Sequence, residues 1–279
     1  MNGRGSELAA AIALTLAACV LPRAASAGGH HCTREIAVPV SASGASVITD
    51  GPQVGGIYPD LLRALSAKNG CSFNFSVVPR ARQVAMYKAG QADILVPASR
   101  TASRDQYGTF IPMINHRAML ISMAGNRAPI TSAQNLLERR ELRVAVVRGF
   151  DYGEAYSALM AELTRQNRLF VEVDVVAVAR LLNAGSADVT IMGPTLMAAA
   201  IRRDPRVHGM QEKLRFEAIP ELPWSASGAY VSHALKPEDQ QTLTEMLEKV
   251  GKSNQVMEGY LRYFRADILS DSVRPRPAN

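Results

Sequence analysis

The sequence predicts an α/β protein with two lobes, and three observations lead to that fold class. Apolar runs with strand character alternate with helical patterns along most of the chain, which is typical of layered α/β folds. The chain has 279 residues, of which 47% are hydrophobic and 20% charged, so it can bury one or two sizeable cores. The third observation is an internal repeat, which indicates how those cores are divided.

A short phrase occurs twice, at residues 77–94 and again at residues 175–189. Each copy predicts a strand end, a short helix, a glycine stop and a new apolar strand that opens at aspartate, Asp93 in the first copy and Asp188 in the second. The 95 residues between these aspartates exceed the roughly 20–50 residues of a solenoid unit. The repeat therefore indicates two similar α/β lobes with a cleft between them, where a small ligand would bind.

The first lobe is expected to begin with strands and helices in alternation. Leucines at positions 61, 62 and 65 form the buried face of a helix that Asn69-Gly70 ends, and Phe73, Phe75 and Val77 alternate as in a strand. The expected elements are strands at 34–40, 72–78 and 93–97, helices at 58–67 and 83–88, and a polar loop at 98–106.

The second lobe repeats the same alternation, with Thr131 or Ser132 as the cap of its first helix. Its expected strands are 142–147, 169–176, 188–192 and 214–219, and its expected helices are 131–138, 153–166, 178–182 and 195–203. Afterwards we expect a strand at 228–232, helices at 237–250 and 255–264, and a frayed end. The sheets are expected to be largely parallel, because strands and helices alternate.

The chain is expected to visit the first lobe, cross to the second and return. A β-rich run at 118–123 is the predicted first crossing, and Pro220, Pro223 and Trp224 mark a stiff return. The predicted ranges are 28–123 for the first part of lobe 1, 124–219 for lobe 2, and 220–279 for the return to lobe 1. Two crossings between lobes would form a hinge.

Residues 1–27 are predicted to be an export signal. Arg4 precedes an apolar run at 8–21, and Ala-Ser-Ala at 25–27 has the small-x-small pattern of a signal peptidase site. The run is shorter than the roughly 18–20 residues that a membrane span needs. We therefore expect a periplasmic protein, and the lipobox-like sequence ending at Cys19 leaves a lipid anchor open as an alternative.

Two cysteines remain after the predicted cleavage, Cys32 and Cys71. Each lies just before a predicted strand, and a helix connects the two strands. Consecutive strands of such a βαβ unit usually lie side by side and parallel, so both cysteines would meet at one end of neighbouring strands. Export to an oxidising compartment then predicts a Cys32–Cys71 disulfide, with two buried thiols as the alternative.

Several function classes lack their signatures in this sequence. There is no P-loop, HExxH motif, nucleophile elbow or dinucleotide fingerprint, and no CxxC with metal-ligand spacing. The formal charge of +6 is scattered, without a basic stripe interleaved with aromatics. We therefore expect no cofactor, no metal and no nucleic-acid partner, and we expect a protein that is not an enzyme.

Four stretches resemble the family 3 periplasmic solute-binding proteins, the receptors of polar amino acid ABC importers. They are Gly-Ile-Tyr-Pro-Asp-Leu-Leu at 56–62, Gly-Gln-Ala-Asp-Ile at 90–94, Ser-Arg-Thr-Ala-Ser-Arg at 99–104 with Phe110 and Pro112, and the strand and turn at 144–149. The resemblance spans about residues 34–264. It implies a type II periplasmic-binding-protein fold, with two α/β lobes joined by a two-strand hinge, and a monomer that serves an ABC permease or a sensor kinase.

The resemblance also implies a ligand site around Arg104. In the family, the matching arginine holds the ligand's α-carboxylate, and the planar guanidinium suits that role. Ser99 and Thr101 offer hydroxyl and backbone N–H groups in the same loop, which leaves the carboxyl end of a strand and faces the cleft. Arg80 and Arg82 follow the second strand toward the same side, and Arg82 is included among the candidates.

On the second lobe, Phe150 and Asp151 lie where a strand turns into a helix N-terminus, a favourable place for an anion. Phe150 is a candidate for stacking, and Asp151 either caps the helix or binds a ligand ammonium. Thr195 is a further candidate. Amino acid binders of the family place a carboxylate where this chain has Gly193, so either Asp151 or Glu154 supplies that charge or the ligand lacks the ammonium.

The sequence thus predicts a periplasmic receptor that captures a small carboxylate-bearing solute by hinge closure and delivers it to an ABC importer. A sensory or accessory receptor without transport is an alternative. The other alternative is an enzyme similar to the cyclohexadienyl dehydratases, which share this fold, with Asp151 or Glu154 as a general acid.

Overall fold

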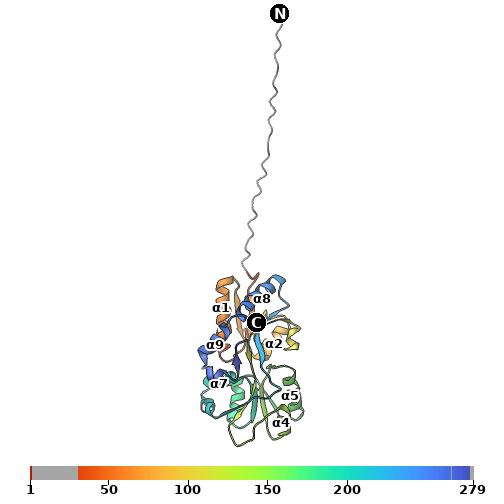
Figure 1. Cartoon of the computed structure of the whole chain (residues 1–279), viewed down its shortest axis with the longest axis vertical. Coiled ribbons are helices and arrows are strands. Elements are labelled where there is room, and N and C mark those ends of the chain that lie inside the picture. Colours follow the sequence, from red (N-terminus) through yellow and green to blue (C-terminus); the bar gives the residue numbers. More distant parts are fainter. Residues whose placement is uncertain (2–30, 265, 277–279) are drawn as a thin grey trace.

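The computed structural model describes Met1, residues 31–264 and residues 266–276. Two groups of elements lie one above the other along the long axis, with α1, α2, α8 and α9 in one and α4, α5 and α7 in the other (Figure 1). Within the described residues, no helix is both long and apolar enough to cross a membrane. Cys19 and the predicted export signal beyond Met1 lie outside the described residues.

The elements of the first group come from both ends of the chain. The N-terminal part contributes β1 (Ile36–Val40), β2 (Ile48–Asp50), β3 (Gln53–Gly55), α1 (Ile57–Asn69), β4 (Phe73–Val77), α2 (Arg80–Lys88), β5 (Ile94–Ser99), α3 (Ala102–Asp105) and β6 (Gly108–His116). The C-terminal part contributes β12 (Ser225–Ser232), α8 (Pro237–Gly251), α9 (Gln255–Tyr263), α10 (Ala266–Leu269) and β13 (Val273–Arg274).

The elements of the second group form one continuous stretch of chain. They are β7 (Met119–Met123), α4 (Ala133–Glu138), β8 (Val144–Val147), α5 (Glu154–Arg165), β9 (Leu169–Glu172), α6 (Val175–Asn183), β10 (Val189–Met192), α7 (Pro194–Arg203), the 3₁₀ helix η1 (Pro205–Lys213) and β11 (Leu214–Glu217). Ser132 caps α4 through its side chain, one of the two capping residues that the sequence predicts.

The α/β fold class is confirmed, but the expectation of largely parallel sheets is wrong. The four-stranded sheet, in the order β13-β6-β12-β5, is antiparallel throughout. In the five-stranded sheet, β11-β7-β10-β8-β9, only β8 has parallel neighbours on both sides. The four-stranded sheet is antiparallel because the chain returns from the second group as β12, which inserts between β5 and β6 and runs opposite to both.

Each group of elements has its own hydrophobic core. In the first, Ile36, Val38, Ile94 and Val231 are essentially fully buried. The five-stranded sheet is covered on both faces by helices: α4 and α5 pack on one side, and α6 and α7 on the other. Two separate cores joined by two connections are what allows one group to move against the other.

The two aspartates of the repeated phrase make similar hydrogen bonds in the two groups of elements. Asp93, before β5, accepts hydrogen bonds from the Arg34 guanidinium at 2.6 and 2.7 Å and from the Ala37 backbone N–H at 2.7 Å. Asp188, before β10, accepts from the Arg143 backbone at 2.8 Å and from its guanidinium at 2.9 and 3.1 Å. In each group, the aspartate therefore ties the repeat to the strand that starts the unit, β1 or β8.

One strand end in the second copy is predicted wrongly. The expected strand 169–176 ends at Glu172, because the Asp174 side chain accepts from the Ala177 backbone N–H and starts α6 at Val175. The strand β6 has no counterpart among the expected elements. Its sequence gives a weak strand signal, because Pro112 interrupts it and its partners come from the far end of the chain.

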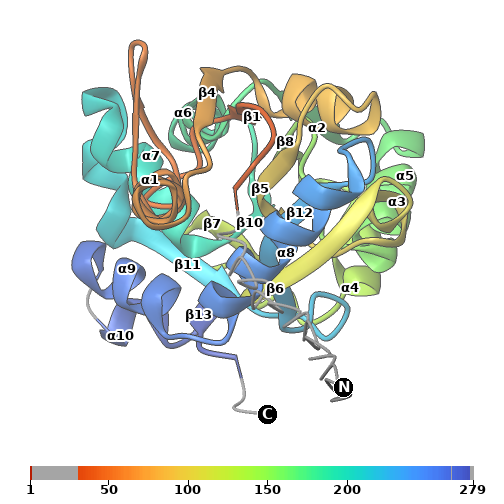
Figure 2. The ribbon, with the colours of Figure 1, turned by 90° about the horizontal axis from the view of Figure 1, so that it is seen from above.

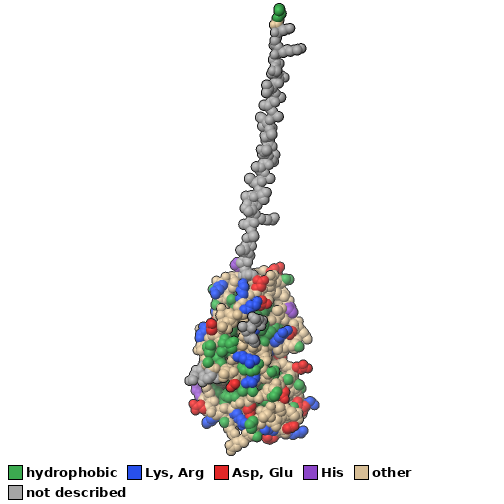
Figure 3. Space-filling model, in the orientation of Figure 1, with side chains coloured by type: hydrophobic (Ala, Val, Ile, Leu, Met, Phe, Trp, Pro, Cys, Tyr) green, Lys and Arg blue, Asp and Glu red, His purple; other side chains and the backbone are tan. Residues whose placement is uncertain are grey.

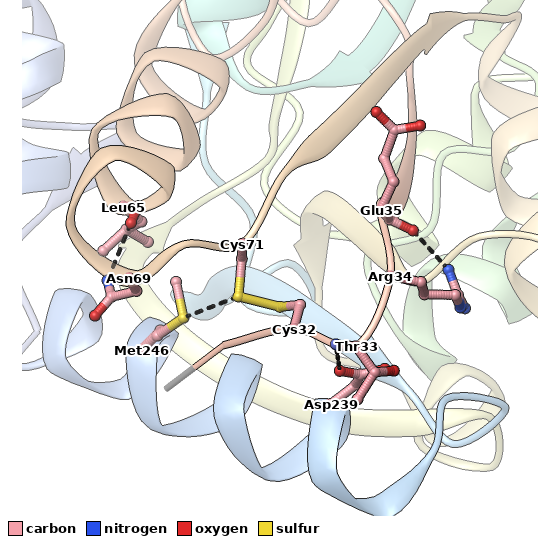
Figure 4. Close-up of a disulfide and its surroundings, with 9 residues drawn as sticks. All are labelled: Cys32, Thr33, Arg34, Glu35, Leu65, Asn69, Cys71, Asp239 and Met246. Carbon is pink, nitrogen blue, oxygen red and sulfur yellow. Dashed lines mark hydrogen bonds between the residues drawn. A yellow bond between two sulfur atoms is a disulfide. The ribbon is translucent and has the colours of Figure 1, made fainter. Parts of the chain in front are cut away.

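The Cys32–Cys71 disulfide is present, as predicted from the βαβ arrangement (Figure 4). Strands β1 and β4 pair in parallel, with Ile36 opposite Phe73, so the two cysteines meet at the same end of both strands. The Met246 sulfur of α8 lies 3.9 Å from the Cys71 sulfur. The disulfide therefore joins the start of the described chain to the core beneath α8.

The chain passes between the two groups twice, from β6 to β7 and from β11 to β12. The predicted crossing segment 118–123 forms β7, which pairs with β10 and β11 inside the five-stranded sheet. The predicted lobe ranges 28–123, 124–219 and 220–279 stay predictions. The pairing of β7 favours a first boundary near Arg117, before this strand.

The described C-terminal segment, residues 270–276, packs on these two connections, although a frayed end is expected from the sequence. Figure 2 shows its strand β13 near β6. Strand β13 pairs with the end of β6, and the Arg117 backbone N–H donates to the Ser272 carbonyl at 3.0 Å. Arg117 and Arg274 lie over the Trp224 ring, at 5.1 and 4.2 Å from its centre. The segment thus packs against the first connection through Arg117 and against the second through Trp224.

Candidate ligand-binding site

A cavity of about 80 Å³ lies between the two groups of elements, which we now call lobe 1 and lobe 2. Both lobes and the C-terminal segment contribute to its wall. The lining residues are Ser43, Ser46, Arg80, Pro97, Ala98, Ser99, His116, Phe150, Asp151, Tyr152, Gly193, Thr195, Leu196, Ser227, Tyr260, Ser272 and Val273.

Arg80 begins α2 and is held in place by Gln83 on the next turn. Its Nη1 donates to Gln83 Oε1 at 2.7 Å. The Gln83 amide nitrogen in turn donates to the carbonyls of Pro39 in β1 and Val96 in β5, at 2.9 and 3.1 Å. Gln83 is fully buried, so it fixes the guanidinium of Arg80 to two strands of lobe 1.

Arg104 lies in the short helix α3, directly behind Ser99. The Thr101 side chain caps this helix, and Arg104 Nη1 donates to the Ser99 carbonyl at 2.9 Å. Arg104 is 2% exposed and its Nε has no hydrogen-bond partner, and the same is true of the Nε of Arg80. Among the described residues, neither arginine forms an ion pair, so two buried cations lack an anion.

The two arginines influence each other's protonation. Burial lowers the pKa of Arg80 to about 9, and the nearby positive charge of Arg104 contributes, while Tyr152 and Asp151 oppose the shift. Burial also lowers the pKa of Arg104, and the charge of Asp151 acts against it. Both shifts have the direction expected of cations that are removed from water without a paired anion.

His116 ends β6 and lines the cavity beside Ser99. Its Nε2 lies 3.1 Å from Ser99 Oγ and 3.3 Å from Ser225 Oγ, so it connects the ends of β5, β6 and β12. Burial lowers the pKa of this imidazole to about 4, and the positive charge of Arg104 adds to the effect. His116 is therefore neutral at pH 7.

The lobe 2 wall is built by the turn that follows β8. Asp151 Oδ1 accepts a hydrogen bond from the Gly153 backbone N–H at 2.9 Å, which shapes the entry to α5. The Tyr152 ring lies between those of His116 and Tyr156, with centres at 6.0 and 5.1 Å. Burial raises the pKa of the Tyr152 hydroxyl, so this group stays neutral.

Gly193 and Thr195 line the cavity where β10 turns into α7. Gly193 is the N-cap of this helix, and Thr195 is 8% exposed. No side chain exists at Gly193 to take a ligand ammonium. Asp151 is thus the one carboxylate among the residues that line the described cavity.

Two glycines let the lobes approach each other closely. Gly149 of lobe 2, at φ +86°, lies so near α2 that an added Cβ would be 2.9 Å from Ala81 Cα. Gly44 of lobe 1 faces α7, where an added Cβ would be 3.1 Å from Ala199 Cβ. These contacts, together with the small cavity, describe a closed arrangement of the lobes.

We predict that Gly149→Ala weakens ligand binding by roughly tenfold or more, because the methyl group would hold lobe 2 away from α2. Gly185→Ala is the matched control: its φ of +65° also strains an alanine, but nothing lies within 4 Å of an added Cβ and the residue does not line the cavity. Titration calorimetry would measure both affinities. Equal losses in the two variants would show that backbone strain, and not lobe contact, is responsible.

The sequence-predicted site residues do not all reach the cavity. Four line its wall, namely Ser99, Phe150, Asp151 and Thr195. Arg104 lies just behind the wall, and Thr101 is buried as the cap of its helix. Arg82 is exposed on α2 and does not line the cavity, whereas Arg80 does, because two residues are about half a turn of helix and so face opposite sides. We therefore replace Arg82 by Arg80 in the proposed site.

Other lining residues lack a sequence signal that points to a site. His116 is an isolated histidine, a pattern that more often marks a structural residue. Tyr260 comes from α9 and bonds Ser46 at 2.6 Å, and Ser272 and Val273 come from the C-terminal segment. These groups reach the cavity through contacts between segments far apart in the sequence, so no local pattern identifies them.

Two lobes that enclose a small cavity, with chain crossings between them, define a two-lobed ligand-binding protein. The chain belongs to the bacterial extracellular solute-binding proteins, family 3, whose family model matches residues 36–266. A comparison with curated proteins found no match.

Solved structures with the same fold include both receptors and sensors. A histidine kinase sensor domain with similarity to periplasmic binding proteins is 20% identical, with a TM-score of 0.66, and the alignment covers 85% of this chain and 97% of that one. The arginine-, lysine-, histidine-binding protein ArtJ from Geobacillus stearothermophilus is 16% identical, with a TM-score of 0.65 and coverages of 83% and 95%. The GluR0 ligand-binding core in complex with L-glutamate is 18% identical, with a TM-score of 0.63 and coverages of 82% and 98%.

Proposed function

We propose that this protein is a periplasmic receptor that closes on a small carboxylate-bearing solute and delivers it to an ABC importer. The observation that carries the proposal is Arg104, a buried guanidinium without an anion behind the wall of an interlobe cavity. A carboxylate between the lobes would supply the missing charge and accept two parallel hydrogen bonds. Ser99 and Ser227 offer hydroxyl groups in the same wall.

Lobe 1 would bind the solute first, because it holds both arginines in fixed positions. Lobe 2 would then close over it and contribute Asp151, Tyr152 and Thr195. In this proposal, lobe 1 consists of residues 28–117 and 220–279, lobe 2 lies between them, and the first 27 residues direct export. The receptor works as a monomer.

The test is thermal unfolding of the mature protein against a panel of amino acids and organic acids. A ligand at 100 times its Kd adds about 2.7 kcal/mol to the unfolding free energy and raises Tm visibly. A rise in Tm with at least one carboxylate is the expected result. No shift with any carboxylate would overturn the proposal.

A sensory role is the second candidate, and the similarity to a histidine kinase sensor domain favours it. The two roles predict different phenotypes once the ligand is known. Deletion of the gene should abolish uptake of the radiolabelled ligand if the protein serves an importer. If uptake persists while ligand-dependent gene expression is lost, the sensory role is correct.

We infer binding and not catalysis at this site. In a dehydratase-like mechanism, a carboxylic acid would have to face the ligand as a proton donor. Glu154 is exposed and does not line the cavity, and one oxygen of Asp151 is engaged by the Gly153 backbone N–H. Recovery of the bound solute unchanged after prolonged incubation would support this inference, and a dehydrated product would contradict it.

A further inference from the structure

A second buried cation, besides Arg104, lies at the cavity. A ligand carboxylate bound to Arg104 would not neutralise it. Arg80 is 9% exposed, lines the cavity, and has an Nε without a hydrogen-bond partner. Within the part of the chain that the structure describes, its guanidinium donates one hydrogen bond, to the neutral amide of Gln83. No carboxylate of the described residues lies within ion-pair distance of it, so its charge is uncompensated in the closed protein.

The charges that face the cavity are unbalanced in one direction. Arg80 in the wall and Arg104 just behind it contribute two positive charges from lobe 1, and Asp151 contributes one negative charge from lobe 2. His116, Tyr152 and Tyr260 are neutral. One Asp151 oxygen is already engaged by the Gly153 backbone. The net charge of these three groups is +1, but Asp151 forms no ion pair with either arginine among the described residues. A ligand with a single carboxylate would therefore leave one buried guanidinium without an ion-pair partner, which is costly.

We propose, on the basis of the proposed function, that the ligand is a small dicarboxylate, with one carboxylate on Arg104 and the other on Arg80. The two guanidinium groups come from different elements, α3 and α2, so they are suited to grip two separate groups of one molecule. Gln83 already orients Arg80 through its bonds to β1 and β5. Ligand binding therefore costs little conformational entropy at the Arg80 side chain.

The size of the cavity agrees with a short ligand. A bound water takes about 10–15 Å³ of such space, so a cavity of about 80 Å³ has room for roughly six water-sized groups. So small a space favours the shortest dicarboxylates, with a backbone of about four or five carbons at most. A cationic ligand such as arginine is disfavoured, because its guanidinium would meet Arg80 or Arg104 in a closed, poorly solvated site.

Dicarboxylates with and without an amino group could both bind the two arginines. The role of Asp151 determines which of them binds more tightly. If its free oxygen binds an ammonium, L-aspartate or L-glutamate will bind more tightly than succinate or glutarate. If Asp151 serves only the turn at Gly153, the unaminated acids will bind at least as well. Either order agrees with the dicarboxylate proposal.

The experiment compares each acid with its amide by titration calorimetry on the mature protein. L-glutamate and L-glutamine have nearly the same shape and differ in one charge, as do L-aspartate and L-asparagine, and succinate and glutarate are measured alongside. At least one dicarboxylate is expected to bind 100-fold or more tightly than any of the amides. Arg80→Met should remove most of this difference, while Arg82→Met, an exposed change two residues along the same helix, should leave it intact.

The outcomes separate the two proposals. If amides or other monocarboxylates bind as tightly as dicarboxylates, and Arg80→Met leaves their affinity unchanged, the dicarboxylate proposal is wrong and the receptor function stands. If no carboxylate binds at all, both proposals are wrong. The comparison of acid with amide on the unmodified protein does not depend on whether the Arg80 variant folds.

Discussion

Replacement of Arg104 by methionine is expected to abolish the stabilisation that a bound carboxylate gives, with an affinity loss of about 100-fold or more. Hydrogen bonds to charged groups contribute about 1.5–3 kcal/mol each, and a guanidinium can make two to one carboxylate. Methionine keeps much of the side-chain volume, so the packing behind Ser99 is largely preserved. The measurement is the ligand-induced Tm shift together with Kd.

The same change should leave the unliganded protein as stable as before, or slightly more stable. Arg104 is a buried cation that forms no ion pair with any described residue, so its removal relieves a desolvation cost and the repulsion from Arg80. The lost hydrogen bond to the Ser99 carbonyl works in the opposite direction. Arg104→Lys is the matched control, because it keeps the charge and lacks the planar fork. A large fall in unliganded Tm would assign Arg104 a structural role instead.

Loss of the Cys32–Cys71 disulfide is expected to lower the unfolding free energy by about 3–4 kcal/mol. The bond closes a loop of sequence separation 39, and loop closure of this length is the main source of the effect in the chain-entropy account. For a chain of this size, each kcal/mol corresponds to about 2–4 °C. Thermal unfolding of the Cys32→Ser/Cys71→Ser variant should therefore show Tm lowered by roughly 10 °C.

A second contact holds the segment around Cys32 in place and limits the loss of stability when the disulfide is removed. The Thr33 backbone N–H and hydroxyl both donate to Asp239 of α8 at 2.7 Å, so the segment stays docked when the disulfide is absent (Figure 4). A reducing agent should lower the Tm of the native protein and leave that of the serine variant unchanged. If the native Tm is unaffected although thiol labelling shows both cysteines reduced, the Thr33–Asp239 contact alone holds the segment.

The charges on one face of the protein do not favour a particular ligand. On the face in Figure 3, Lys and Arg side chains lie among Asp and Glu over both lobes and do not form a continuous basic stripe. The discriminating charges are inside the cleft. For this reason, the decisive experiments change buried arginines and glycines at the lobe contact, and use exposed Arg82 as the reference.

Most of the fold was predictable from local patterns. Hydrophobic periodicity and glycines at the helix ends gave strong signals. They identified the helix starting near Tyr58, the strand at Phe73 and the repeated phrase. The antiparallel sheet was not predictable in this way. Strand β6 has a proline inside it and pairs with β12 and β13, which lie more than 100 residues further along the chain.

The sequence by itself determined the α/β class, the repeat, the disulfide partners and the polar stretch that carries Ser99, Thr101 and Arg104, although this stretch forms the end of β5 and helix α3 and not the expected loop. All of these depend on residues close together in the chain or on the regular geometry of one βαβ unit. Tertiary structure decided which groups face the ligand. It placed Arg80 and not Arg82 at the cavity, because the period of α2 separates their faces, and it brought His116, Tyr260 and Val273 to the same wall through contacts between distant segments.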